Sequence, residues 1–199
     1  MHTNQKSPLV LSIIGKSGAG KGTQVKLLRE EFGFKYVGSG DLLRKRKETH
    51  DFTGDKVASV IDFGGISPSS IVFKLCIDEF EKIKNEGVGL GIVIDGAPRK
   101  PLEARMIEEA MDWYEWLENY KVIVVDISDE EVFKRLLKRG ELEGRSDDTE
   151  EGIKKRLEWY KREVEPVIEF FEEKGRIVRI NGEQSVEDVY KEIKQKLGL

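Results

Sequence analysis

The chain has 199 residues, long enough to bury the core of one domain, and 38% of them are hydrophobic while 36% are charged. Its net charge of −4 disfavours a general nucleic-acid-binding surface, and its one cysteine excludes a disulfide framework or a thiolate metal site. The start, MHTNQKSPLV, has no signal-peptide or membrane-anchor pattern. We therefore expect a cytoplasmic protein with no membrane partner and no nucleic-acid partner.

Apolar runs rich in β-branched residues predict strands that are buried on both faces, as in a parallel sheet covered by helices. These runs lie at residues 9–15, 36–38, 90–96, 121–128 and 176–181. The segments between them have helical patterns, so strands and helices alternate along the chain. The predicted fold class is therefore α/β, with three α/β/α layers around a five-stranded parallel sheet.

Several of the predicted helices carry an N-terminal signal. Ser67 predicts an N-cap with Pro68 at the first helical position. Ser128 followed by Glu131 predicts a capping box. Pro166 lies inside a longer helical pattern, where we expect it to kink the helix.

A glycine-rich stretch, GKSGAGKGT, joins the first predicted strand to the first predicted helix. Four residues separate Gly15 from Gly20-Lys21, which is the spacing of a phosphate-binding P-loop. Successive backbone N–H groups of such a loop form a nest for phosphate oxygens, and the positive end of the helix adds to the attraction. The usual hydroxyl after the lysine is displaced by one position. We expect nucleotide contacts from Gly18, Ala19, Gly20, Lys21, Gly22 and Thr23.

Arginines recur downstream in a number that one bound nucleotide does not require. They occur in SGDLLR (39–44), in DGAPR (95–99), in the segment 134–148 and at position 156. A guanidinium group binds phosphate oxygens in pairs and keeps its charge. Two phosphorylated molecules held end to end would account for Arg44, Arg99, Arg139, Arg145 and Arg156.

These motifs, in this order, resemble those of adenylate kinase and its nucleoside monophosphate (NMP) kinase relatives, from Leu9 to about Leu197. GKSGAGKGTQ resembles the family P-loop, SGDLLR its Thr-Gly-Asp element, DGAPR its Asp-Gly-aromatic-Pro-Arg element and GRSDD its lid. The resemblance implies a single domain and a monomer. It divides the chain into a core at about 1–38, 69–139 and 149–199, an NMP-binding lobe at about 39–68 and a short lid at about 140–148.

The resemblance also implies an activity, the reversible transfer of the γ-phosphoryl group of ATP·Mg²⁺ to AMP. Catalysis would consist of alignment and charge neutralisation. The catalytic residues would be Lys21, Asp95, Arg99, Arg139, Arg145 and Arg156. ATP would also contact Arg135 and Gln184, in addition to the P-loop and Arg139. The acceptor would contact Ser39, Gly40, Arg44, Gly65, Ser67, Gly96, Arg99, Glu103, Arg145 and Arg156.

The implied metal is Mg²⁺, held through water molecules near Thr23 and Asp95. The short lid has no cysteine, so we expect no structural zinc. Asp147 and Asp148 would help to organise the closed lid, or would cap the helix that begins near Thr149. The lobe and the lid would close over the two substrates and exclude water.

Two departures from the family pattern concern the acceptor site. Ala97 replaces a large aromatic residue, and Glu103 replaces the glutamine of AMP-specific members. An amide matches both N6 and N1 of adenine, whereas an ionised carboxylate only accepts hydrogen bonds and fits guanine or cytosine better. Ser39 keeps the hydroxyl of the AMP enzymes. AMP is therefore the expected acceptor, with GMP, CMP, UMP or a deoxy form as the alternative.

Two other classes of P-loop protein compete with an NMP kinase. One is a switch or ATPase without an acceptor, and the other is a regulatory nucleotide-binding protein that has lost activity. The chain lacks the Asn-Lys-x-Asp signature of GTPase switches, and SGDLLR and DGAPR would have no role in either class. We therefore expect a phosphotransferase.

Overall fold

The computed structural model describes residues 8–62, 65–143 and 148–199. Its five strands form one sheet in the order β2-β3-β1-β4-β5, and all neighbouring strands are parallel. The predicted strands and the α/β fold class are confirmed, with small shifts at the strand ends. The strands are β1 (Leu9–Gly15), β2 (Lys35–Gly38), β3 (Gly91–Asp95), β4 (Tyr120–Asp126) and β5 (Ile177–Asn181).

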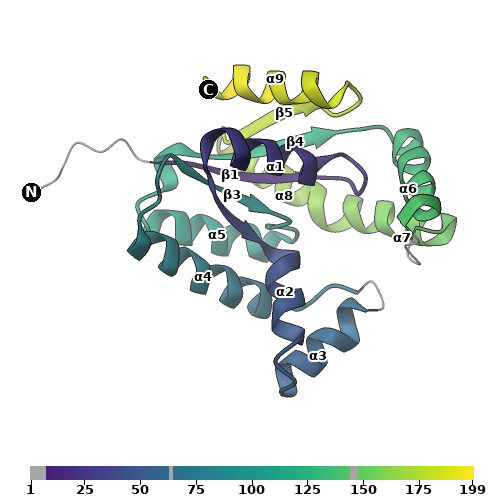
Figure 1. Ribbon diagram of the computed structural model, residues 1–199, viewed down its shortest axis with the longest axis horizontal. Coiled ribbons are helices and arrows are strands. Elements are labelled where there is room, and N and C mark those ends of the chain that lie inside the picture. Colours follow the sequence, from purple (N-terminus) through teal and green to yellow (C-terminus); the bar gives the residue numbers. More distant parts are fainter. Residues whose placement is uncertain (1–7, 63–64, 144–147) are drawn as a thin grey trace, which may run out of the picture.

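Helices cover both faces of the sheet (Figure 1). One face packs against α4 (Ser69–Glu86), α5 (Pro101–Trp113) and α8 (Glu165–Glu173). The other face packs against α1 (Lys21–Phe32), α6 (Asp129–Glu143), α7 (Glu150–Trp159) and α9 (Val186–Leu197). Two further helices, α2 (Ser39–Lys47) and α3 (Phe52–Ile61), project away from the sheet. Within the described ranges, no helix is long and apolar enough to cross a membrane.

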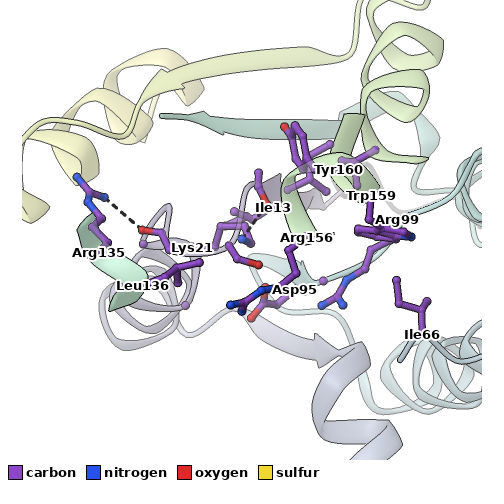
Figure 2. A pocket seen from close by; sticks show the side chains of 18 of the residues that line it. Ile13, Lys21, Ile66, Asp95, Arg99, Arg135, Leu136, Arg156, Trp159 and Tyr160 are labelled. Atoms are coloured by element: carbon purple, nitrogen blue, oxygen red, sulfur yellow. Dashed lines mark hydrogen bonds between the residues drawn. The ribbon is translucent and has the colours of Figure 1, made fainter. Parts of the chain in front are cut away.

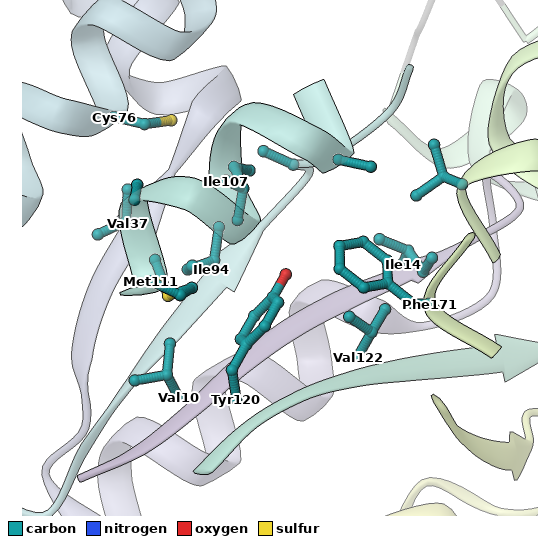
Figure 3. Close-up of a cluster of buried hydrophobic side chains, with 14 of the residues drawn as sticks. Val10, Ile14, Val37, Cys76, Ile94, Ile107, Met111, Tyr120, Val122 and Phe171 are labelled. Carbon is teal, nitrogen blue, oxygen red and sulfur yellow. The ribbon is translucent and has the colours of Figure 1, made fainter. Parts of the chain in front are cut away.

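The strand side chains divide between two hydrophobic clusters, one on each face of the sheet. In β1, Val10 and Ile14 belong to the cluster formed with α4, α5 and α8, which Figure 3 shows in close-up. Leu11 and Ile13 belong to the cluster on the opposite face. Burial of each such side chain stabilises the fold by about 1.5–3 kcal/mol. Both faces therefore need apolar residues, which explains the continuous apolar runs in the sequence.

Helix α4 begins differently from the prediction. Pro68 is the N-cap residue, because its ψ of 140° is extended rather than helical. Its carbonyl oxygen accepts hydrogen bonds from the N–H groups of Ile71 and Val72. The prediction that Ser67 caps this helix is therefore wrong, since Ser67 lies one residue before the cap.

The capping box predicted at the start of α6 forms only in half. The Ser128 hydroxyl accepts a hydrogen bond from the Glu131 N–H at 3.3 Å. The Glu131 carboxylate, however, binds Arg135 at 2.7 Å, while the Ser128 N–H donates to the carboxylate of Glu183. The Glu131 carboxylate thus pairs with the charged guanidinium of Arg135, one helical turn away, instead of accepting the Ser128 N–H.

Pro166 lies in the first turn of α8, directly after a π-helical turn, η2 (Tyr160–Val164), that joins α7 to α8. Proline has no N–H and cannot continue the regular ladder of helical hydrogen bonds. The irregularity expected at Pro166 therefore takes the form of a π turn, a device that often occurs at functional sites.

Candidate functional site

A cavity of about 650 Å³ lies where β1 and β3 end. Its walls come from the loop after β1, the segment after α3, the loop after β3, helix α6, and α7 with η2 (Figure 2). Parallel strands end at the same edge of the sheet, where ligands of open α/β folds bind. The predicted residues in the wall are Gly18, Gly20, Lys21, Gly22, Thr23, Gly65, Asp95, Gly96, Arg99, Arg135, Arg139 and Arg156.

The glycine-rich loop leads directly into α1. Gly18 and Gly20 have φ angles of 81° and 84°, a region in which residues with a Cβ are strained. Helix α1 has no side-chain cap at its N-terminus. The unbonded N–H groups of an uncapped helix end attract anions. The loop therefore has the form that phosphate binding requires.

Lys21 is bound to its own loop in this structure. Its Nζ donates to the carbonyl oxygens of Gly15 at 2.9 Å and Lys16 at 2.8 Å. Burial, reinforced by the positive charge of Arg99 and opposed by Asp95, lowers the pKa of Lys21 to about 8. The cavity therefore carries an excess of positive charge that an anionic ligand would neutralise.

The nucleotide-free protein is expected to become more stable between about pH 7.5 and about pH 9 because of Lys21. Its pKa in the folded protein is about 8, below the usual 10.5, so the unfolded chain binds more protons in this window and stability rises with pH. The gain is about 1 kcal/mol. Urea unfolding of the wild type and of Lys21→Met measures it, because other titrating groups contribute to both proteins. An equal pH dependence in the two proteins would contradict the lowered pKa.

Asp95, at the end of β3, lies near Lys21 in the cavity wall (Figure 2). Burial raises the pKa of Asp95, while Lys21 and Arg99 oppose the shift. Burial lowers the pKa of Arg99, and Asp95 opposes that shift in turn. A Cβ on Gly96 would lie 2.5 Å from Nη2 of Arg99, so the guanidinium packs directly against this glycine. The Ser39 hydroxyl donates to the Gly96 carbonyl at 2.7 Å and ties α2 to the same loop.

Two of the predicted catalytic arginines share one buried carboxylate. Asp148 accepts hydrogen bonds from Nε and Nη2 of Arg139 at 2.6 and 2.8 Å, and from Nη2 of Arg156 at 2.6 Å. Burial raises the pKa of Asp148, but these hydrogen bonds outweigh it and lower the pKa, so the carboxylate stays ionised. Thr149, not Asp148, caps α7 by accepting a hydrogen bond from the Gly152 N–H at 3.1 Å. Asp148 therefore holds the two guanidinium groups side by side.

Some of the predicted contact residues lie outside the cavity wall. Arg44 is exposed on α2 and forms an ion pair with Asp41, three residues earlier. Gln184 donates to the backbone of Asn181 and to the carboxylate of Glu192. Ala19 is buried in the core and Gly40 lies on α2, while Arg145 and Asp147 fall outside the described residues.

Glu103 is buried at the start of α5. One carboxylate oxygen accepts a hydrogen bond from the backbone N–H of Arg99 at 2.8 Å, and the other accepts one from the Ser69 hydroxyl at 3.1 Å. The hydroxyl of Ser67, two residues before Ser69, is also buried and has no hydrogen-bond partner. An unsatisfied buried hydroxyl costs about 1–3 kcal/mol, which a ligand with a matching group would recover.

Residues that the motifs did not indicate also line the cavity. Trp159 and Tyr160 follow Arg156 by three and four positions, so all three share a helix face. That spacing is the signal that could have identified them. The other lining residues outside the motifs are Ile13, Ile14, Ile66, Leu136 and Val164, whereas Gly15, Ser17 and Pro98 belong to the motifs but had no predicted contact.

The fold and the cavity together define a P-loop α/β protein with a strongly cationic cleft at the edge of the sheet. The family model "Adenylate kinase" matches residues 13–176 of the chain. The chain therefore belongs to the adenylate kinase family, and it is a phosphotransferase of the NMP kinase class.

Curated relatives match the chain over most of its length. Adenylate kinase of Thermus thermophilus is 32% identical over 186 residues, which are 94% of this chain and 95% of the relative. Adenylate kinase isoenzyme 1 of Sus scrofa is 33% identical over 193 residues, covering 97% and 96% of the two chains. Adenylate kinase 1 of Nostoc sp. is 35% identical over 188 residues, covering 94% and 98%. The family resemblance seen in the motifs is thus confirmed.

Proposed function

We propose that the protein transfers the γ-phosphoryl group of ATP·Mg²⁺ reversibly to AMP, forming two molecules of ADP. The observation that carries this proposal is the single cavity in which Lys21 of the phosphate loop faces arginines from three other segments, namely Arg99, Arg139 and Arg156. One nucleotide on the loop leaves these arginines in excess, so a second phosphorylated ligand is required to use them. The names of the relatives support AMP as that ligand.

ATP would lie along the glycine-rich loop and the first turn of α1. Lys21 would exchange its two backbone carbonyl partners for phosphate oxygens, whose charge would raise its pKa again. Arg135 lies at the edge of this region, 2.9 Å from the Gly182 carbonyl and 2.7 Å from Glu131. It would lie against the donor adenine, with Gln184 close by.

Asp95 and Thr23 fit the requirements of Mg²⁺. This ion keeps several water molecules and binds proteins through one or two carboxylates together with substrate phosphates. Among the described residues, the cavity wall offers one carboxylate, Asp95, and it includes the hydroxyl of Thr23 in the first turn of α1. When bound, the ion neutralises charge on the phosphate oxygens of ATP.

The phosphoryl group would pass between nucleotides held by guanidinium groups. Arg99 would bind the phosphate of the acceptor, and Arg139 and Arg156 would surround the transferring group together with Arg145. In this structure the ionised carboxylate of Asp148 holds Arg139 and Arg156 adjacent to each other. Groups that are already charged and placed before the reaction stabilise the transition state without further reorganisation.

The exposed position of Arg44, which does not line the cavity although its charge acts on Asp95 and Arg99, supports a closing movement of the lobe at about 39–68. Closure of this lobe and of the lid at about 140–148 over the remaining core would bring further arginines to the phosphates and expel water. We also propose that the protein is cytoplasmic and monomeric, as expected from the sequence.

A coupled assay for ADP tests the proposed reaction, with ATP alone as the control. We expect ADP only when a nucleoside monophosphate is present, with two molecules of ADP formed for each ATP consumed when that acceptor is AMP. ADP formed from ATP without an acceptor would indicate an ATPase instead. In a panel of AMP, GMP, CMP, UMP and their deoxy forms, a preference for GMP or CMP of about tenfold or more would overturn AMP as the acceptor.

The carboxylate of Glu103 favours GMP or CMP as a second candidate, because it presents only hydrogen-bond acceptors. The unpartnered Ser67 hydroxyl counts toward AMP, since it can donate to a ring nitrogen of adenine while Glu103 accepts the amino group. Ser67 and Glu103 would together supply the one donor and one acceptor that a glutamine amide supplies in AMP-specific members.

The substitution Glu103→Gln should raise the AMP:GMP ratio of kcat/KM about tenfold, or about 1.4 kcal/mol. The amide oxygen can still accept the Arg99 N–H while the Ser69 hydroxyl turns to accept from the amide nitrogen, so stability should change by less than about 1 kcal/mol. Steady-state kinetics with both acceptors provide the measurement, and the exposed Glu109→Gln on the same helix is the control. An unchanged ratio would show that the carboxylate does not contact the base.

A further inference from the structure

Lys16, the second residue of the glycine-rich loop, binds across the molecule rather than into the main cavity. Its Nζ donates to the Ile127 carbonyl at 2.9 Å and to Oδ1 of Asp129 at 2.5 Å. Its side chain is only 18% exposed. Lys16 lines a separate cavity of about 320 Å³, so its ammonium is directed away from the site where phosphates would bind.

Asp129, the first residue of α6, connects three elements that line the main cavity. Oδ1 binds Lys16 of the phosphate loop, and Oδ2 lies 3.5 Å from Nζ of Lys161 in η2. The hydrogen bond from Lys16 is the main reason that the pKa of Asp129 lies below its usual value. The ionised carboxylate therefore links the phosphate loop, α6 and the π turn that carries Tyr160.

This link matters because α6 carries arginines toward the donor side of the cavity. Arg135 and Arg139 lie on α6, and both line the cavity wall with Lys21. Arg135 itself reaches the Gly18 carbonyl only at 3.4 Å, a longer contact than either bond of Lys16. Lys16 therefore makes the shortest described polar contact between the loop and the start of α6.

Ion pairs within a single helix of this protein cannot have the same effect. Lys134 and Glu131, for example, lie one turn apart on α6 at 3.5 Å, and the lysine side chain is 78% exposed. A pair within one helix cannot fix that helix against another element, and solvent weakens it. The Lys16–Asp129 pair joins residues more than a hundred positions apart in the sequence and is partly buried.

We propose that Lys16 and Asp129 are positioning residues for the donor nucleotide. Their bond fixes the start of α6 against the phosphate loop, which sets the position of Arg135 and Arg139 relative to Lys21. The pair itself contacts no phosphate. This inference rests on the proposed function in one respect, namely that ATP is the nucleotide bound by the loop.

The test compares Lys16→Met, Asp129→Asn and the double variant with the wild type, and uses Lys134→Met as the control. Each single variant should raise KM for ATP about five- to tenfold and change KM for AMP less than about twofold. The double variant should be no worse than the more impaired single variant, because both changes break one bond. Lys16→Arg, which can still donate to Asp129, should restore KM for ATP to near the wild-type value.

Two results would overturn the inference. One is an unchanged KM for ATP in Lys16→Met and Asp129→Asn. The other is a parallel rise of both KM values that follows a lower Tm, since a general loss of stability would explain it. Calorimetric titration with ATP keeps this test independent of the proposed function. A wild type that binds ATP but forms no ADP would refute the kinase, whereas equal ATP affinity in wild type and Lys16→Met would refute the positioning role.

Discussion

Replacing Lys21 by methionine should lower kcat by about three orders of magnitude, with ATP and the acceptor both saturating. Lys21 is the lysine of the phosphate loop that lines the main cavity, near Asp95 and Arg99. Methionine has a similar length but no charge, so the packing of α1 is kept. Charge that develops during transfer then loses a preorganised partner, which affects the transition state more than the bound substrates.

The same substitution should not weaken the nucleotide-free fold. Burial holds the pKa of Lys21 at about 8, which means that its charged form is disfavoured in the folded protein. Methionine removes that cost together with the two hydrogen bonds to the loop carbonyls. We therefore expect the free energy of unfolding of Lys21→Met at neutral pH to lie within about 1 kcal/mol of the wild-type value.

Steady-state kinetics and urea unfolding together check this prediction. Lys26→Met is the matched control, because Lys26 lies on the same helix with its side chain 73% exposed and 3.8 Å from Glu30. That control should keep the wild-type kcat and stability. A Lys21→Met enzyme that retained more than about a tenth of the wild-type kcat would remove Lys21 from the proposed mechanism.

The sheet could be predicted from the sequence because its strands are buried on both faces. Val10 and Leu11 are neighbours in β1, yet each is buried in a different cluster. The strand therefore has no exposed face, and it lacks the alternation of apolar and polar residues that a half-exposed strand shows. The phosphate loop could also be predicted from the sequence, since the positive φ angles of Gly18 and Gly20 favour glycine at those positions. The apolar runs and the glycine spacing are both local sequence patterns, so they can be recognised without knowledge of the tertiary structure.

The pairing of the arginines could not be predicted from the motifs. The motifs indicate which guanidinium groups would meet phosphates, but in this structure several of these groups bind carboxylates of the protein itself. Arg44 binds Asp41 on its own helix, and Arg139 binds Asp148. The role of Lys16 was hidden for a different reason, since only the fold brings it to Asp129. Its position in the loop pattern accepts any residue.

The substitution Arg139→Ala should lower kcat about 10²- to 10³-fold, the usual cost of removing one preorganised donor from a developing charge. Stability should fall by only about 1–2 kcal/mol, because Arg156 remains 2.6 Å from Asp148 and the buried carboxylate keeps a charged partner. A purely structural role would give the opposite balance, with a large loss of stability and a small effect on turnover. The ratio of the two effects therefore distinguishes a catalytic arginine from a supporting one.

The measurements are kcat at saturating substrates and the free energy of unfolding in urea, with the exposed Arg105→Ala on α5 as the control. Arg139→Ala with full activity would contradict the catalytic assignment. A decisive comparison is the variant Arg156→Ala. Asp148 binds both guanidinium groups, so each single variant leaves one ion pair with this carboxylate intact. Similar small losses of stability combined with large losses of kcat in both variants would follow only if both arginines leave Asp148 to act on the transferring phosphoryl group.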